Sequence, residues 1–94
     1  MALTFEWDAA KALGNTRKHG VTFEEASTVF GDPLSLTIPD PVHTRRSEQR
    51  LLTLGLSIAR RLLVVVHLEY GETLRIISAR PATSRERKDH EEGR

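Results

Sequence analysis

The sequence predicts one domain of the α+β class with the element order β-α-α-β-β-β-β-α. Three observations predict it: two capped amphipathic stretches near the N-terminus, four apolar or alternating segments joined by short turns, and a polar, capped segment at the end. A chain of 94 residues has room for one hydrophobic core, so the domain is expected to span 1–94. Consecutive strands joined by short turns favour a mostly antiparallel sheet, with the two N-terminal helices packed on one face.

A short strand and a helix are expected first. The segment 3–7 has strand character, and Asp8 is suited to cap a helix over 9–19. Gly20 follows at the position where a residue in the left-handed conformation ends a helix. The caps therefore define both ends of this helix.

A second helix follows at once. Thr22 and Glu25 form a T-x-x-E motif, which predicts a capping box, and Val21 is placed to pack on Ala26. Gly31 and Pro33 are expected to end this helix.

Strands are expected over the next part of the chain, at 34–38, 50–57, 61–69 and 73–79. The run Leu62–Val66 is apolar at every position, which is typical of a central strand covered on both sides. A second capping box, Thr83 with Glu86, predicts a terminal helix. That helix has almost no apolar face after Ala82, so we expect it either to fray or to serve a partner.

Composition excludes several classes of protein. The absence of cysteine excludes disulfides, thiolate metal sites and a cysteine nucleophile. The first ten residues lack the basic and apolar regions of a signal peptide, and the longest apolar run is far shorter than a membrane span. A soluble, cytoplasmic protein without a membrane partner is expected.

No metal or other cofactor is expected. The histidines are scattered and form no H-x-x-x-H pair: His19, His43, His67 and His90. None of them has an acidic cluster beside it, whereas a metal site needs several ligands in one place. The chain also lacks a glycine-rich phosphate loop.

Positive charge is concentrated in the second part of the chain. Residues 1–40 carry three Lys/Arg and six Asp/Glu, whereas residues 41–94 carry eleven Lys/Arg and seven Asp/Glu. A local basic surface on a chain of net charge +1 suggests a specific anionic partner. The alternative is an ordinary surface of mixed charge.

Arginines gather around the predicted strands: Arg45, Arg46, Arg50, Arg60, Arg61, Arg75 and Arg80. The planar guanidinium suits phosphate because it can form two parallel, charge-assisted hydrogen bonds. Arg75 and Arg80 are five residues apart, so a regular strand would direct them to opposite faces. They share a face only if the strand ends or bulges near Ala79. Alternatively, Arg75 pairs with a surface acid such as Glu69 or Glu72.

Long segments of the chain resemble the BrnT family of type II toxins. They are "FEWDAAKALGNTRKHGVTFEEASTVFGDP", "SEQRLLTLG", "RRLLVVVH" and "RIISARPATSRER", in the family's order and with similar spacing over nearly the whole chain. The resemblance implies a small RelE-like ribonuclease that cleaves RNA without a metal and arrests growth. It also implies neutralisation by a cognate BrnA antitoxin, in a complex that binds operator DNA through the antitoxin.

The resemblance also implies roles for particular residues. Arg75 and Arg80 are expected to bind phosphate and stabilise the transition state, with Arg61 or Arg60 assisting. Other expected residues are Glu48 as base or orienting group, His19 as proton donor, and Lys18, Arg50 and Arg85 as phosphate contacts. His90 stands near the place where the family usually carries a tyrosine, which puts that tyrosine's role in doubt here.

Two alternatives remain at this stage. The same basic surface would also suit a non-catalytic module that binds nucleic acid or a partner, because binding needs only cations. Convergence of Glu48 or His19 with the arginines would favour the enzyme. Trp7 could stack on a base, but it lies between a strand and a helix cap, and we interpret it as a core residue.

Overall fold

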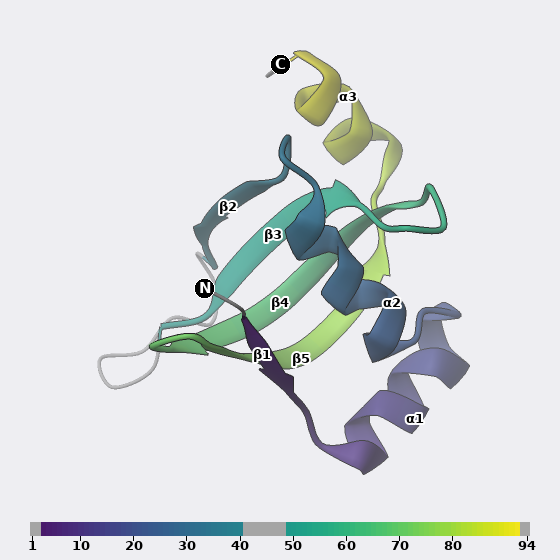
Figure 1. Cartoon of the computed structure of the whole chain (residues 1–94). Helices are drawn as coiled ribbons and strands as arrows, with labels where there is room; N and C mark the ends of the chain where they lie inside the picture. Colours follow the sequence, from purple (N-terminus) through teal and green to yellow (C-terminus); the bar gives the residue numbers. More distant parts are fainter. Residues whose placement is uncertain (1–2, 41–48, 93–94) are drawn as a thin grey trace.

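A five-stranded sheet with helices against one face forms the body of the molecule, which is known from a computed structural model that describes residues 3–40 and 49–92. The α+β class is confirmed. In Figure 1, α1 and α2 lie on one side of the sheet, while α3 stands beyond one end of it. The elements are β1 (Thr4–Glu6), α1 (Ala9–His19), α2 (Phe23–Thr28), the 3-10 helix η1 (Val29–Gly31), β2 (Leu36–Pro39), β3 (Leu51–Leu56), β4 (Leu62–Tyr70), β5 (Thr73–Pro81) and α3 (Ser84–Glu92).

The sheet is mixed, in the spatial order β1-β5-β4-β3-β2. The strands β2 to β5 form antiparallel pairs, with short turns joining β3 to β4 and β4 to β5, but β1 runs parallel to β5. A parallel neighbour needs a long connection, and the two helices after β1 are part of one. The sheet is therefore antiparallel in four strands and parallel at one edge, while the RelE-like topology remains a prediction.

The first helix has the predicted bounds, because each of its caps is formed by residues only a few positions apart in the sequence. The Asp8 carboxylate accepts a hydrogen bond from the Lys11 amide at 2.9 Å. Gly20 has a φ of 69°, in the left-handed region, and its amide donates to the carbonyl of Thr16.

The second helix has only half of its predicted capping box. The Thr22 hydroxyl accepts from the Glu25 amide at 3.0 Å, as expected. The Glu25 carboxylate, however, accepts hydrogen bonds from Arg61 and Ser57. Hydrogen bonds to Arg61 and Ser57, which are distant in the sequence, have replaced the local hydrogen bond that the Glu25 carboxylate would make in a capping box.

The main core lies between the helices and one face of the sheet, called here the covered face. Its fully buried members come from both layers: Val21, Phe23, Ala26, Val29, Leu63, Val65, Ile76 and Ala79. Trp7 packs against this core, with its ring edge-on to that of Phe23 at a centroid distance of 5.9 Å. The interpretation of Trp7 as a core residue is confirmed.

The alternating leucines of β2 and β3 point to the other side of the sheet, called here the open face. Thr53 and Gly55 pair with the core residues Val65 and Leu63, and cross-strand partners point to the same side. The leucines between them therefore face away from α1 and α2. Gly55 is required on the covered face, since a Cβ there would lie 2.9 Å from the Cβ of Ser35.

A β-bulge changes the register of β5. Val66 pairs with Ser78 but His67 pairs with Ile76, so Ile77 is an extra residue. Arg80 pairs with Val64 and Arg75 with Leu68, and these two partners lie four apart on β4. Arg75 and Arg80 therefore share the open face, because the strand bulges at Ile77, two residues before Ala79, the position near which the sequence requires a bulge or a strand end for a shared face.

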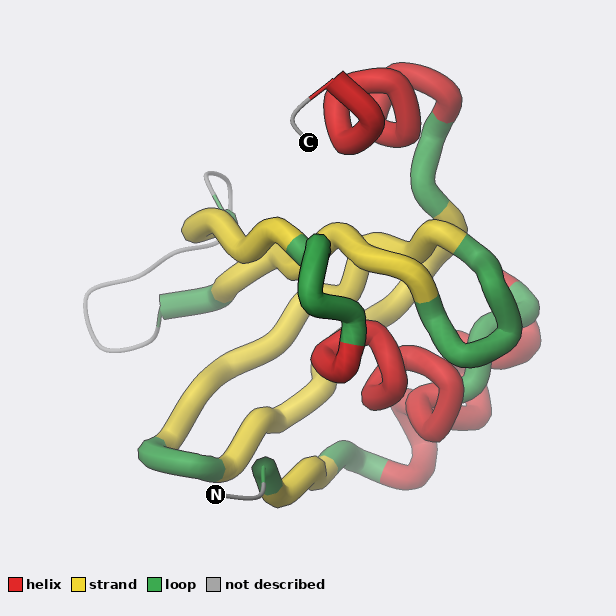
Figure 2. Tube along the Cα trace, turned by 45° about the horizontal axis from the view of Figure 1, so that its top comes forward, coloured by secondary structure: helices red, strands yellow, loops and turns green. Residues whose placement is uncertain are grey.

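The terminal helix is anchored by polar groups. Both halves of its capping box form: the Glu86 amide donates to the Thr83 hydroxyl, and the Thr83 amide donates to the Glu86 carboxylate. His90 is buried against the body, at 3% exposure. Figure 2 shows α3 standing apart from the other helices, and an ion pair between Arg80 of β5 and Glu86 ties it to the sheet. Within the described residues, no helix is long and apolar enough to cross a membrane.

Candidate functional site

Most of the predicted site residues lie at the end of the sheet where β4 begins and β5 finishes. Three chain segments meet there: the C-terminal turn of α1, the turn between β3 and β4, and the connection from β5 to α3. Together they carry six of the expected residues, named here the basic end: Lys18, His19, Arg60, Arg61, Arg80 and Arg85.

Asn15 ties the end of α1 to the sheet. Its side-chain amide donates to the carbonyls of Val21 and Ala79, at 3.0 and 2.8 Å, and its oxygen accepts from the Ala79 amide. Asn15 is only 7% exposed. Sequence reasoning missed this residue. The signal was an asparagine inside a helix, where its polar side chain needs partners outside the helix.

Arg61 joins three elements. Its Nε donates to Glu25 at 2.9 Å, its Nη2 donates to the other oxygen of the same carboxylate, and Nη2 also donates to the carbonyl of Gly20 at 3.0 Å. The hydrogen bonds from Arg61 hold the pKa of Glu25 below its usual range, and those to Glu25 raise the pKa of Arg61. Glu25, which sequence reasoning assigned to a cap, therefore fixes the guanidinium beside the turn that carries Lys18 and His19.

Arg80 is held in a similar way from the other face of the sheet. Both terminal nitrogens of its guanidinium donate to Glu86, each at 2.8 Å. The hydrogen bonds from Arg80 lower the pKa of Glu86 to about 2, and those to Glu86 raise the pKa of Arg80. Because Arg61 points to α2 and Arg80 to α3, the two guanidinium groups flank the end of the sheet from opposite faces.

The net positive charge of the basic end comes from its other members. Within the described part of the chain, the side chains of Lys18, Arg60 and Arg85 are exposed and make no hydrogen bond or ion pair. A carboxylate balances the charge of Arg61, and another balances that of Arg80. The arrangement thus combines rigid, neutralised arginines with free cations, which suits contact with a chain of phosphates.

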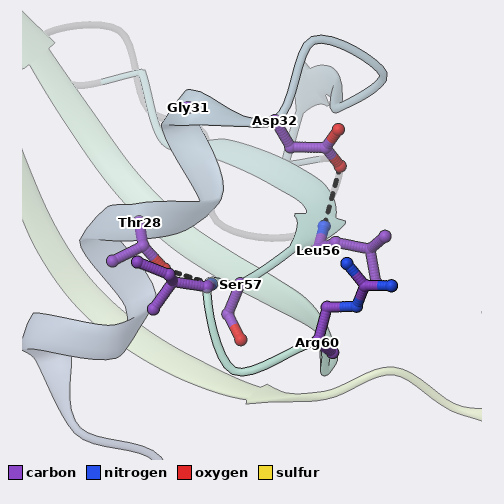
Figure 3. A pocket seen from close by; sticks show the side chains of 7 residues that line it. Thr28, Gly31, Asp32, Leu56, Ser57 and Arg60 are labelled. Carbon is purple, nitrogen blue, oxygen red and sulfur yellow. Dashed lines mark hydrogen bonds between the residues drawn. The ribbon is translucent and has the colours of Figure 1, made fainter.

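Arg60 has an unusual backbone conformation. Its φ is 66°, a region that residues with a side chain rarely adopt and that costs of order 1 kcal/mol. Its guanidinium lies along a hollow of about 440 Å³ between η1 and the β3–β4 turn (Figure 3). Two hydrogen bonds fix the walls: Leu56 N–H donates to Asp32 and Ile58 N–H donates to Thr28, at 2.8 and 2.9 Å.

The structure does not bring the remaining predicted residues to this end. Arg75 lies four β4 positions from Arg80, which is about 13 Å along the strand. Its Nη1 donates to Glu6 at 3.0 Å, so an acid does pair with it, although not one of the two named from the sequence. Arg50 precedes β3, at the same far end as Arg75. Glu48 lies outside the described residues.

A buried polar chain crosses the covered face at that far end. The Nε2 of His67 and the Oγ1 of Thr53 are 2.7 Å apart, and the hydroxyls of Thr53 and Thr37 are also 2.7 Å apart. His67 is fully buried, and burial lowers its pKa to about 4. The imidazole is therefore neutral at physiological pH, and its ring meets that of Phe30 edge-on. This group stabilises the core and lies far from the basic end.

Metal ligands are not grouped in the part of the chain that the structure describes: no three His, Asp or Glu side chains could hold an ion together. What the basic end offers is hydrogen-bond donors and positive charge. Such an end can orient a phosphate and stabilise negative charge that grows on it.

Comparison with solved structures identifies the fold. The chain is similar to the crystal structure of the Brucella abortus ribonuclease toxin BrnT, with a TM-score of 0.67 and 22% sequence identity over 88% of this chain and 100% of that one. A family model described as the ribonuclease toxin BrnT of type II toxin–antitoxin systems matches residues 7–86. The chain therefore belongs to the BrnT family of ribonuclease toxins. Among curated proteins, none matches the sequence significantly.

Proposed function

We propose that this chain is an endoribonuclease that cleaves RNA by attack of a ribose 2′-hydroxyl on the adjacent phosphate, without a metal ion. The supporting observation is that the three chain segments carrying the basic end meet at one end of the sheet, where Arg61 and Arg80 flank it from opposite faces. The residues concerned are Lys18, His19, Arg60, Arg61, Arg80 and Arg85. The substrate supplies the nucleophile in this reaction. The enzyme has to align the phosphate, stabilise its growing charge and move two protons.

The proposed reaction balances without any co-reactant. The bond from the 2′-oxygen to phosphorus forms, and the bond from phosphorus to the 5′-oxygen of the next nucleotide breaks. A base takes the 2′-hydroxyl proton, and an acid protonates the departing 5′-oxygen. The products are a 2′,3′-cyclic phosphate and a free 5′-hydroxyl.

The proposed roles of the described groups follow their positions, and that of Glu48 follows the family resemblance. Arg80 and Arg61 stabilise the phosphate, with Lys18, Arg60 and Arg85 along the flanking backbone. His19 is the proposed proton donor, since it stands beside Gly20, whose carbonyl accepts from Arg61. Glu48 remains the proposed base or orienting group. The far-end residues Arg50 and Arg75 are assigned to outer contacts with the RNA backbone or the partner.

A second candidate is a module that binds nucleic acid or a partner without cleaving. The free cations would serve such a module equally well, because backbone binding depends on charge alone. The position of His19, next in the chain to the Gly20 carbonyl that accepts from Arg61, favours the enzyme, since proton transfer needs a titratable side chain whereas binding does not.

The partner in this proposal is a BrnA-like antitoxin that binds operator DNA in the complex, and the site of action is the cytoplasm. Growth arrest is expected when the chain is produced without its antitoxin. We further propose that acidic and apolar antitoxin residues cover the face that carries Arg75 and Arg80, so that RNA and antitoxin compete. A ternary complex with full affinity for both would contradict this competition.

The metal-free mechanism is tested with purified protein and single-stranded RNA in EDTA. We expect cleavage to persist and the products to carry 2′,3′-cyclic phosphates and 5′-hydroxyls. Activity that disappears on chelation and returns with magnesium would refute it.

The roles of the arginines are tested with two variants, Arg80→Ala and Arg75→Ala, because both residues lie on the open face of β5. Arg80→Ala is expected to lower the cleavage rate about 10²–10³-fold, the typical cost of losing a positioned charge-stabilising group. Arg75→Ala breaks a similar ion pair about 13 Å away and is expected to cost less than about threefold. Glu86→Gln is the control for α3, because it breaks the ion pair but retains Arg80. Equal activity of Arg80→Ala and the parent chain would show that the assignment of Arg80 is wrong.

A further inference from the structure

The open face carries an apolar groove that the described residues leave uncovered. It holds about 200 Å³ and runs across three strands to the base of α3. Five apolar side chains line it, together with two acids of α3: Leu36, Ile38, Leu52, Leu54, Val64, Glu86 and Asp89. Leu36 is 44% exposed and Ile38 is 55% exposed, although both belong to a strand of the sheet. Contiguous exposed apolar side chains on a sheet mark a binding surface.

The edge beside this groove is poorly suited to accept another strand. The Asp40 amide donates to the Arg50 carbonyl, so by antiparallel alternation the backbone groups of Ile38 and Leu36 also point to β3. The groups that point outward belong to Thr37 and Pro39, and proline has no N–H to donate. A partner would therefore bind the side chains of the open face instead of extending the sheet.

The charges around the groove indicate the polarity of its occupant. Glu86 already pairs with Arg80, but Asp89 makes no hydrogen bond or ion pair among the described residues. An occupant with apolar residues for the floor and a lysine or arginine for Asp89 would complement both. A second copy of this chain fits less well, because a two-fold contact would bring two acidic rims together.

We infer that the groove receives an amphipathic helix of the antitoxin, with its apolar stripe on Leu36, Ile38 and Leu54 and a cation beside Asp89. The occupant is the antitoxin of the proposed function, on which this inference rests: the family is one of toxin–antitoxin systems. The groove anchors the antitoxin on the face that also carries Arg80, which brings it to the edge of the proposed catalytic end.

The test measures binding and cleavage in the same preparations. The probe is the small protein encoded beside this chain, and its Kd is measured by calorimetry. Ile38→Glu and Leu36→Glu are expected to raise the Kd at least about tenfold, as loss of an apolar anchor does. Both variants should cleave RNA at the parent rate and resist neutralisation. Asp89→Lys should raise the Kd a few-fold, with weaker salt dependence.

Leu13→Glu is the matched control, because Leu13 on α1 is 55% exposed, like Ile38, but lies off the open face. Its Kd should equal that of the parent chain. Parent-like Kd values for both groove variants would overturn the inference. So would a parent chain that does not bind the neighbouring protein, or one that dimerises alone through Ile38 in light scattering. Loss of RNA cleavage in the parent chain refutes the ribonuclease mechanism instead, while the binding data still decide the groove.

Discussion

The two faces of the sheet are both apolar but meet different surroundings. On the covered face, α1, α2 and η1 bury Ile76 to 1% exposure and enclose the polar side chain of His67 completely. Among the described strand residues, the open face is buried only along β4, at Leu62, Val64 and Leu68. Along β2, Leu36 and Ile38 keep about half of their surface in water, and α3 stands beyond one end of the sheet (Figure 1).

The difference teaches that apolar character in a strand does not by itself identify the core. The cleanest alternation in the chain, in β2 and β3, belongs to the open face, whereas Thr53 and Gly55 of β3 face the helices. Apolar surface that folding leaves exposed is available for binding. The covered face therefore holds the fully buried side chains of the core, and the exposed part of the open face is where a partner gains most by association.

The largest expected effect is on the free energy of unfolding, when an isoleucine on each face is replaced by alanine. Ile76→Ala removes a fully buried side chain and is expected to lower the free energy of unfolding by about 2–5 kcal/mol. Ile38→Ala should change it by about 0.5 kcal/mol or less, since that side chain is already half in water. Urea denaturation of the two variants measures both values. Similar losses would mean that the open face is part of the core.

The next effect concerns the buried imidazole of the covered face. His67 stays neutral in the folded protein down to its pKa of about 4, whereas in the unfolded chain it gains a proton near 6.5. The unfolded state thus binds more protons between these values, so stability falls as pH drops from 6.5 to 4. The loss should be of order 3 kcal/mol.

The experiment compares unfolding free energies across this pH range for the parent chain and His67→Gln. The variant lacks the titrating group, so the difference between the two profiles isolates its contribution. Parallel profiles would show that the imidazole is protonated inside the fold.

The smallest effect belongs to the ion pair on the open face. Glu86→Gln is expected to cost about 1 kcal/mol at neutral pH, because the pair is partly exposed. The pKa of Glu86 is about 2 in the fold and 4.5 without its partners, so its contribution is present above 4.5 and is lost as pH falls toward 2. Amide hydrogen exchange should show faster opening of α3 alone. Glu91→Gln, at an exposed position without a described partner, should leave exchange unchanged.

Local chemistry made several elements predictable. The bounds of α1 follow from Asp8 and Gly20, and the start of α3 follows from Thr83 and Glu86, because each cap involves residues only a few positions apart. The strands were also predicted to within a few residues, since alternation and turn residues are local signals.

The candidate site was only partly predictable, for the same reason. The sequence shows that arginines accompany the strands, but not which of them meet. Arg61 and Arg80 reach one end of the sheet with His19, whereas Arg50 and Arg75 lie at the other. Distances between residues far apart in the chain depend on strand register, which is difficult to predict from a single sequence.

The sequence by itself determined the α+β class, the helix caps and the residue types from which the basic end is built, because propensity, capping and periodicity act over a few residues. Only the tertiary structure decided three other features. Glu25 leaves its cap for Arg61, the bulge at Ile77 brings Arg75 and Arg80 to one face, and β1 pairs parallel to β5. Each depends on a contact between distant segments, where packing and pairing of whole strands outweigh local preference.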